Sequence, residues 1–313
     1  MKQILTLALV LFSMQAAFSA DSLSFGDNTI TWRVYESDGP VVAFAPQGTG
    51  IWYSTGTAVS FYDVKTTKVT PYTDLGSISS AGINAIVVDL TGAVWFGGTN
   101  GAACLKGGKF TVYNSKKEGL TAPINRMKLD RNGDIWFATE AGAVQYKSGS
   151  FVVHGLANLG SESIRDVALD GSGNAYFATD KGVAVFKNGA WKKYTTADGL
   201  SFNDVKAIAI DSKTGIIYAA AGELDVCSYN GKEWSGYMDI QKGITCIMVD
   251  TQSRIWFGGT SGILKFNGDE WISDPAKVGF PAAQVLDMYR DSRGDLYFAI
   301  ERGVLHMKNP YPY

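Results

Sequence analysis

An aromatic residue within a short apolar run recurs seven times along this chain at nearly constant spacing. The seven runs are Ile51-Trp52-Tyr53, Val94-Trp95-Phe96, Ile135-Trp136-Phe137, Ala175-Tyr176-Phe177, Ile217-Tyr218-Ala219, Ile255-Trp256-Phe257 and Leu296-Tyr297-Phe298. Their central aromatic residues are separated by 43, 41, 40, 42, 38 and 41 residues. A regular period of this length indicates repeated structural units, and it limits the possible folds more than any other feature of the sequence.

Each repeat carries the same turn and strand signals around its aromatic residue. An Asp stands six residues before it in five repeats and seven before it in the fifth: Asp89, Asp130, Asp170, Asp250, Asp291 and Asp211. A Gly follows it by six residues in five repeats: Gly101, Gly142, Gly182, Gly262 and Gly303. Asp caps turns and Gly adopts positive φ, so these positions predict tight turns between short strands. Several repeats then end on an aromatic-x-x-Tyr strand, as in Trp191–Tyr194.

Each unit is therefore expected to be a four-stranded antiparallel sheet. One small sheet cannot bury both of its faces alone, whereas sheets arranged radially around an axis cover one another. The repeats predict an all-β, seven-bladed β-propeller. The seventh repeat has only three strands, while Trp32-Arg-Val-Tyr35 matches the fourth-strand signature before the first repeat. Residues 29–35 are predicted to pair with the strand at Val304–Met307, which would complete the last blade and close the ring.

The first residues resemble a secretory signal peptide. Lys2 precedes an apolar run, Ile4–Phe12, that is too short to span a bilayer, and Ala17-Phe18-Ser19 offers a cleavage site before Ala20. Residues 1–19 are expected to be removed and residues 20–313 to form a single domain. No later stretch is long and apolar enough for a membrane span. We expect a soluble protein that is periplasmic or secreted.

Charge and cysteine content exclude some classes of protein. Without Lys2 the chain has 27 Lys and Arg against 30 Asp and Glu, so a nucleic-acid partner is not expected. Cys104, Cys227 and Cys246 are irregularly spaced and odd in number, which argues against a disulfide framework. They are interpreted as buried small apolar residues, although one bridge remains compatible with an oxidising compartment.

The repeat resembles the two-component regulator propeller repeat. The fourth repeat shows the pattern well, in the segments Ile164–Asp170, Ala175–Val183, Trp191–Tyr194 and Gly199–Leu200. The resemblance covers nearly all of residues 20–313. It implies a propeller of the kind that forms the extracytoplasmic sensor half of hybrid sensor kinases, where polysaccharide fragments are among the ligands. Because this sequence has no transmembrane, kinase or receiver segment, the resemblance implies a stand-alone recognition or scaffold module.

Polar side chains are predicted to surround one mouth of the axial channel. They come from the starts of the innermost strands and from the turns between second and third strands. The candidate ligand-binding residues are Asn125, Arg126, Arg165, Asp166, Lys206, Glu140, Asp180, Glu301 and Arg302. Glu223 occupies a similar turn, and Phe202 and Phe280 are candidate stacking residues in loops between blades. One interpretation is a pocket for a small hydrophilic ligand. The other is a solvated mouth in which the charges neutralise each other.

Two further interpretations are weaker. Asp130–Asp134 and Asp170–Asn174 place oxygen atoms at alternate positions, as calcium loops do, but they lack the Gly and Glu that such loops require. Turn capping explains these residues, and no metal or cofactor is predicted. The regular aromatic residues could be sugar-stacking platforms, but recurrence inside strands favours a core between blades.

The sequence gives little support to catalysis. It has no nucleophile elbow, zinc-binding helix motif or phosphate loop, and its two histidines, His154 and His306, fall in different blades away from the candidate face. The favoured function is non-catalytic recognition of a glycan, peptide or protein outside the cytoplasm. The alternative is a streptogramin-lyase-like enzyme, a lyase or hydrolase that uses face carboxylates with a divalent metal. An assembly role in an envelope complex is a third possibility.

Overall fold

The computed structural model describes residues 22–25, 28–222, 225–237, 243–266, 271–272 and 283–308. The expected signal peptide at residues 1–19 and the side chains of Glu223 and Phe280 lie outside these residues. Within the described part, no helix is long and apolar enough to cross a bilayer.

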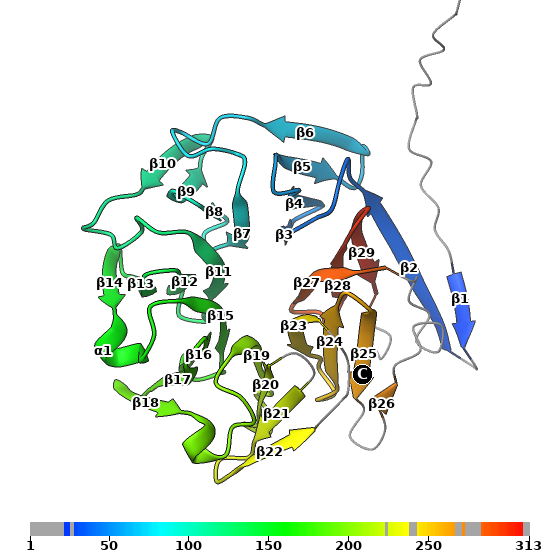
Figure 1. Ribbon diagram of the computed structural model, residues 1–313. Helices are drawn as coiled ribbons and strands as arrows, with labels where there is room; N and C mark the ends of the chain where they lie inside the picture. Colours follow the sequence, from blue (N-terminus) through cyan, green and yellow to red (C-terminus); the bar gives the residue numbers. More distant parts are fainter. Residues whose placement is uncertain are drawn as a thin grey trace, which may run out of the picture.

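Seven antiparallel sheets form a ring around a central axis, as Figure 1 shows. Each sheet is one blade. In blades 1 to 6 the first strand in sequence lies nearest the axis, and in blade 7 the innermost strand is β27, because β1 and β2 join that sheet at its outer side. The seven-bladed, four-stranded propeller predicted from the repeat is confirmed. The innermost strands β3, β7, β11, β15, β19, β23 and β27 follow one another around the axis, so their side chains line the channel.

From the axis outwards, blade by blade, the strands of the first four blades are β3 (Ala43–Gln47), β4 (Gly50–Ser54), β5 (Val59–Asp63), β6 (Lys68–Tyr72); β7 (Ile83–Val88), β8 (Val94–Gly98), β9 (Gly101–Lys106), β10 (Lys109–Tyr113); β11 (Ile124–Leu129), β12 (Ile135–Thr139), β13 (Gly142–Lys147), β14 (Ser150–His154); β15 (Ile164–Leu169), β16 (Ala175–Thr179), β17 (Gly182–Lys187), β18 (Ala190–Tyr194). Helix α1 (Leu156–Leu159) links blades 3 and 4, and the 3-10 turn η1 (Thr196–Asp198) links blades 4 and 5.

The other three blades follow the same plan: β19 (Val205–Ile210), β20 (Ile217–Ala221), β21 (Asp225–Tyr229), β22 (Trp234–Tyr237); β23 (Ile244–Val249), β24 (Ile255–Gly259), β25 (Gly262–Phe266), β26 (Trp271–Ile272); β27 (Val285–Arg290), β28 (Leu296–Ile300), β29 (Gly303–Met307), β2 (Asn28–Glu36) and β1 (Ser22–Phe25). Each of blades 1 to 6 has four antiparallel strands, so the chain leaves a blade on the same face of the ring on which it entered it. Every innermost strand therefore begins on that face. We call this the upper face; it also carries the turns between second and third strands. The turns between first and second strands lie on the lower face.

The N-terminal strand closes the ring. β2 pairs with β29 in the register Trp32↔Met307 to Glu36↔Gly303, so the predicted closure of the ring by an N-terminal strand is confirmed. The pairing with β29 covers residues 32–36 rather than the predicted 29–35. The structure adds one strand that the repeat pattern does not predict. β1 pairs with the first half of β2, from Ser22↔Thr31 to Phe25↔Asn28, and gives blade 7 a fifth strand. The sequence signature covers only residues 32–35, so it carries no signal for this extension.

The recurring Asp residues cap the lower-face turns, as predicted. In blade 4, Asp170 Oδ1 accepts hydrogen bonds from the backbone N–H of Ser172 at 2.8 Å and of Asn174 at 2.9 Å. Its Oδ2 accepts one from the Tyr176 hydroxyl at 3.1 Å, which ties the turn to the central aromatic residue. Asp89 and Asp250 cap their turns in the same way and bind the indole N–H of Trp95 and Trp256. The carboxylates interpreted as turn caps are therefore satisfied by the protein itself.

The recurring Gly at the start of the third strand is required by a close backbone approach. Gly182 has φ +121°, and a Cβ there would lie 2.1 Å from the carbonyl oxygen of Tyr194 in the adjacent fourth strand. Gly303 repeats this geometry in blade 7, where the approaching carbonyl belongs to Tyr35 of β2. The N-terminal strand thus occupies the same position as the fourth strand of another blade.

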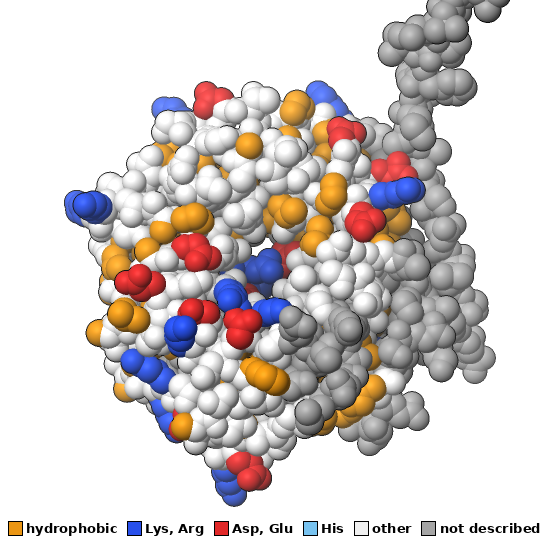
Figure 2. Space-filling model, in the orientation of Figure 1, with side chains coloured by type: hydrophobic (Ala, Val, Ile, Leu, Met, Phe, Trp, Pro, Cys, Tyr) orange, Lys and Arg blue, Asp and Glu red, His pale blue; other side chains and the backbone are white. Residues whose placement is uncertain are grey.

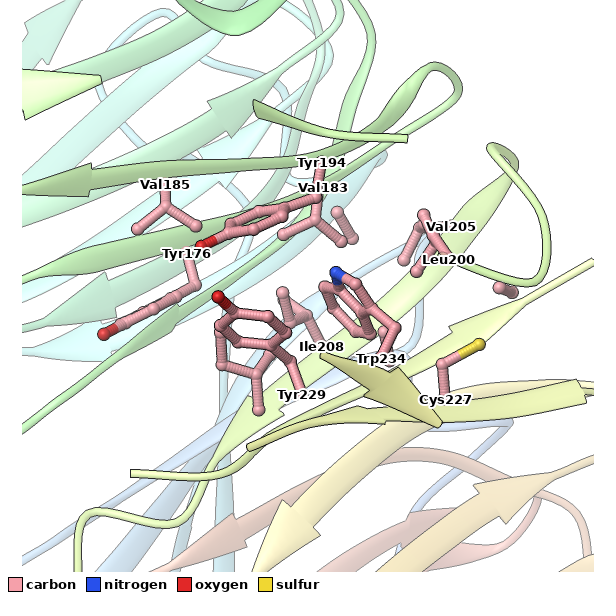
Figure 3. Packing of buried hydrophobic residues seen from close by; sticks show 14 of the residues in the cluster. Tyr176, Val183, Val185, Tyr194, Leu200, Val205, Ile208, Cys227, Tyr229 and Trp234 are labelled. Atoms are coloured by element: carbon pink, nitrogen blue, oxygen red, sulfur yellow. The ribbon is translucent and has the colours of Figure 1, made fainter. Parts of the chain in front are cut away.

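The central aromatic residues form the core between blades, as expected, and none is more than 9% exposed. Figure 3 shows this packing between blades 4 and 5, where Tyr194, Tyr229 and Trp234 lie against one another. The Tyr194 and Tyr229 rings have centroids 4.8 Å apart, and those of Tyr229 and Trp234 are 5.2 Å apart. All three cysteines are buried and form no disulfide with one another, which agrees with their interpretation as apolar core residues.

We expect Gly182→Ala to destabilise the protein by about 3 kcal/mol or more, because its Cβ would collide with a backbone oxygen that is held in the sheet. The matched control is Gly189→Ala. Gly189 also has positive φ, +79°, but a Cβ at this position would have nothing within 4 Å, so the cost should be only the conformational one of about 1 kcal/mol. Urea unfolding of both variants measures the difference, and equal losses would contradict the close-approach explanation.

Candidate functional site

A β-bulge shapes the start of the innermost strand in six of the seven blades. In β11 the register shifts between Ile124 and Arg126, which leaves Asn125 unpaired, and the same shift occurs in β7, β15, β19, β23 and β27. The six bulged residues are Asn84, Asn125, Arg165, Lys206, Thr245 and Leu286. A bulge re-aims the side chains on either side of it. The bulged residue therefore lies at the upper mouth, and the next residue lies inside the channel.

Asn125 and Glu140 meet on the upper face of blade 3. The side-chain amide of Asn125 donates to Glu140 Oε1 at 2.5 Å and to the carbonyl oxygen of Ile164 at 2.9 Å. The other oxygen of Glu140 accepts a hydrogen bond from the Ser163 hydroxyl at 2.8 Å. Since Ser163 and Ile164 belong to blade 4, these bonds connect two neighbouring blades across the upper face.

Asp180 and Arg165 form a second polar group on blade 4. Asp180 accepts a hydrogen bond from the Ser161 hydroxyl at 2.5 Å, which lowers the pKa of its carboxyl group, and Lys181 lies 3.5 Å from its other oxygen. Arg165 forms an ion pair with Asp204, which precedes β19 of blade 5. The side chains of Arg165 and Asp204 are 33% and 48% exposed, so solvent screens this pair and it contributes little to stability.

Blade 5 presents two upper-face side chains that are open to a ligand. Lys206 is the bulged residue of β19 and is half-buried; it makes no hydrogen bond or ion pair with another residue that the structure describes. Phe202 lies in the loop between blades 4 and 5 and is 49% exposed. A cation and an exposed aromatic ring can each bind an anionic or sugar-like group, and Lys206 has no ion-pair or hydrogen-bond partner among the described residues.

Glu301 and Arg302 stand apart from the other candidates. They form the turn between β28 and β29 on blade 7, and both are exposed. The backbone carbonyl of Arg302 accepts a hydrogen bond from Ser37 N–H at 3.1 Å, but neither side chain contacts another candidate in the described residues. The structure therefore groups the upper-face candidates on blades 3 to 5.

Arg126 and Asp166 lie inside the channel, below the mouth. Arg126 Nη1 is 2.9 Å from Asp287 Oδ1, and its Nε is 3.5 Å from Asp166 Oδ1. Blades 3 and 7 are not neighbours in the ring, so the pair between Arg126 and Asp287 crosses the axis. We call Arg126, Asp166 and Asp287 the axial ion layer.

Backbone groups also hold the carboxylates of the axial ion layer. Asp166 accepts hydrogen bonds from the N–H of Val167 at 2.8 Å and of Ile208 at 3.0 Å, and Asp287 accepts one from Met288 at 2.9 Å. Burial disfavours the charged form of Arg126, but the carboxylates of Asp287 and Asp166 outweigh this effect and raise its pKa. Burial raises the pKa of Asp166 as well, and Arg126 offsets only part of that increase.

The buried thiol of Cys246 lies beside the axial ion layer. Cys246 follows the bulge of β23, and burial together with the nearby Asp287 carboxylate raises its pKa to about 12. The thiol is therefore neutral at physiological pH and is not an activated nucleophile.

Open space in the channel lies below the axial ion layer. Two cavities, of about 290 Å³ and about 190 Å³, occupy the lower half of the channel, and Arg126, Lys128, Asp287 and Tyr289 line both of them. The larger faces blades 4 to 6 and the smaller faces blades 1 and 2. Figure 2 shows acidic and basic side chains around the upper mouth and a basic group within the central opening.

A separate cavity of about 590 Å³ lies on the lower face between blades 7 and 1. Its walls include Tyr35, Tyr297 and His306, whose imidazole stacks on Tyr297 at 4.4 Å between ring centroids and lies 3.0 Å from Asp295 Oδ2. None of the candidate residues lines this cavity. His154, at the outer strand of blade 3, instead stacks on the buried Trp136 at 5.3 Å.

The sequence pattern places adjacent residues such as Arg165 and Asp166 in one group at the mouth of the channel. The bulge separates them, so Arg165 lies at the upper mouth and Asp166 lies deeper, inside the channel. The pattern also leaves Asp204 and Ser163 outside the site, and it does not connect Asp287 with Arg126. The pairing across the axis depends on which residue follows each bulge. The bulge falls at the same point of six first strands, so the sequence carries no separate signal for this pairing.

No protein-family model matches this chain, and no curated protein matches it. Among solved structures, the extracellular domain of a putative hybrid two-component system protein of B. thetaiotaomicron is similar, with a TM-score of 0.69 and 16% identity over 88% of this chain. This chain spans 40% of the length of that protein.

Two other similar structures match over nearly their whole length. A streptogramin B lyase has a TM-score of 0.66 and 17% identity over 93% of this chain and 97% of its own. YCF48, solved bound to D1 peptide, has a TM-score of 0.66 and 13% identity over 92% of this chain and 97% of its own. At these identities the likeness shows the propeller fold alone.

Removing the guanidinium of the axial ion layer tests its structural role. We expect Arg126→Met to lower the free energy of unfolding by about 3 kcal/mol, because Asp166 and Asp287 would lose their shared cation. The double variant Arg126→Met/Asp287→Leu should lose less than the sum of the two single variants, by about 1 kcal/mol or more. Chemical unfolding of the four proteins measures this coupling, and additive losses would show that the two side chains do not interact.

Proposed function

We propose that this protein is an extracytoplasmic, non-catalytic recognition module that binds a glycan, peptide or protein through the upper face of blades 3 to 5. The observation that carries the proposal is the contrast between two kinds of position. Positions that build the blades repeat one residue type, such as the Asp turn caps and the Gly at the start of the third strand. The bulged positions at the upper mouth instead hold Asn, Arg, Lys, Thr and Leu in different blades.

The arrangement of charge supports binding of a polar ligand. On blades 3 and 4 the carboxylates of Glu140 and Asp180 accept hydrogen bonds from serine hydroxyls, which fixes their orientation. On blade 5, Lys206 and Phe202 offer a cation and an aromatic ring. A preformed polar surface beside an open cation and ring suits a ligand that presents hydroxyl, amide or carboxylate groups. One similar propeller is described as bound to a peptide and another as part of a two-component system, and both roles are of this recognition type.

The competing function is a lyase or hydrolase that uses face carboxylates with a divalent metal. Such chemistry needs a carboxylate that is free to bind metal or exchange a proton in contact with substrate. Glu140 and Asp180 are each held by neighbouring side chains, so they fit a binding surface better than an acid–base pair.

The extracytoplasmic location rests on the signal sequence at residues 1–19. A mature N-terminus at Ala20, found by mass spectrometry of the exported protein, would support it.

The test is a ligand screen on residues 20–313 by thermal shift, followed by calorimetry, with glycan fragments, peptides and divalent cations as probes. Because a ligand that binds only the native state raises its melting temperature, one probe class should stabilise the protein. Lys206→Ala should weaken binding of that probe at least tenfold, since a charge-assisted contact is lost. Phe202→Ala should weaken it less.

The matched control is Lys187→Ala, which removes an exposed lysine at the end of β17 on the lower face. It should leave the affinity unchanged. A stabilising probe whose affinity is the same in Lys206→Ala and Lys187→Ala would place the site elsewhere. Turnover of a probe that depends on a divalent cation would favour the enzyme instead.

A further inference from the structure

We propose that the larger cavity in the lower half of the axial channel is a binding site for a small carboxylate with a short apolar chain. This site is distinct from the upper face and does not depend on the proposed function. We call it the lower chamber; it has a volume of about 290 Å³ and lies between the axial ion layer and the lower face. At about 30 Å³ for each water molecule, that volume could hold about ten waters or one small organic ligand.

The walls of the lower chamber include residues that lie two positions beyond the residue that follows the bulge in each innermost strand, at the level of the axial ion layer. Side chains alternate along a strand, so these residues share a strand face with the layer. They are Lys128, Ala168, Ala209, Met248 and Tyr289. Ala168 and Ala209 are short, and this leaves the space unfilled on the side of blades 4 and 5. Met248 is flexible and apolar, so it can adapt to a hydrocarbon chain.

The positive groups of the chamber are not all neutralised by protein. Asp166 and Asp287 already form ion pairs with Arg126 and accept hydrogen bonds from backbone N–H groups. Lys128 is half-buried and Arg290 is exposed at the lower mouth; neither has a hydrogen bond or ion pair with any residue that the structure describes. With these groups ionised, three cations face two carboxylates, which leaves one positive charge in excess.

That excess determines the charge of the ligand. A carboxylate brings one negative charge and can bind Lys128 and Arg290, while its apolar chain contacts Ala168, Ala209 and Met248. A doubly charged anion such as phosphate would leave uncompensated negative charge beside Asp166 and Asp287, where burial makes it costly. A neutral ligand would leave the excess positive charge uncompensated in a partly enclosed space, because Lys128 acts on Asp166 only at a distance and forms no ion pair with it. A singly charged carboxylate therefore fits both the charge and the walls.

Hexanoate is the probe of choice, with hexan-1-ol as its uncharged match, and calorimetry on residues 20–313 measures both affinities. Hexanoate should bind with a stoichiometry of one and at least tenfold more tightly than hexan-1-ol. From acetate to hexanoate, each added methylene should strengthen binding about threefold, because it removes apolar surface from water. Equal binding of hexanoate and hexan-1-ol, or no binding of hexanoate, would overturn the proposal.

Two lysine variants locate the carboxylate. Lys128→Met keeps the length of the side chain and removes its charge, so it should fold normally and weaken hexanoate binding at least tenfold. Its matched control, Lys206→Met, removes a half-buried lysine of the upper mouth and should leave hexanoate binding unchanged. Ala209→Leu should abolish binding by filling the chamber. An unchanged affinity in Lys128→Met, or an equal loss in Lys206→Met, would reject the site, whereas failure of the upper-face screen would leave this result unaffected.

Discussion

The pairing of β2 with β29 is the constraint on which the rest of the molecule depends. Each blade buries its two faces only against its neighbours, so an open ring would expose the apolar faces of blades 7 and 1 to water. The register from Trp32↔Met307 to Glu36↔Gly303 joins the two ends of the repeat array without a covalent bond. The close approach of the Tyr35 carbonyl to Gly303 reproduces the contact within other blades, so closure uses the same geometry as the blade interior.

The repeated contacts between blades also explain why the residues of the candidate site can vary. Turn caps, positive-φ glycines and buried aromatic rings are each required by contacts that recur in several blades, so substitution there affects the fold. Side chains at the axis have neighbours from many blades and few obligatory contacts. The innermost strands can therefore carry Arg126 in one blade, Asp166 in the next and Ala207 in the following one at the same position after the bulge. The scaffold tolerates a different set of charges at every blade.

Periodic features of this fold could be predicted from the sequence because they are local and repeated. Blade number, strand order, the role of the Asp caps and the closing strand all follow from spacing and turn chemistry. The fifth strand of blade 7, β1, could not be predicted, since it lies before the first repeat signature. The position of Arg126 inside the channel could not be predicted either, because it depends on the bulge at Asn125. Its partner Asp287 lies in a blade on the other side of the axis, so no local pattern connects the two residues.

The axial ion layer divides the channel into two environments with different chemistry. Above it, Glu140, Asp180 and Arg165 bind to nearby side chains and remain partly exposed, as the proposed recognition of a polar ligand requires. Below it, Lys128 faces alanine and methionine side chains in a partly enclosed space, where a single charge is screened less and interacts more strongly. Arg126 pairs with Asp166 of the adjacent blade and with Asp287 across the axis, so the ion layer separates the two environments. The two proposed sites would therefore let one scaffold, whose blades are built by the same rules, bind two ligands of different polarity.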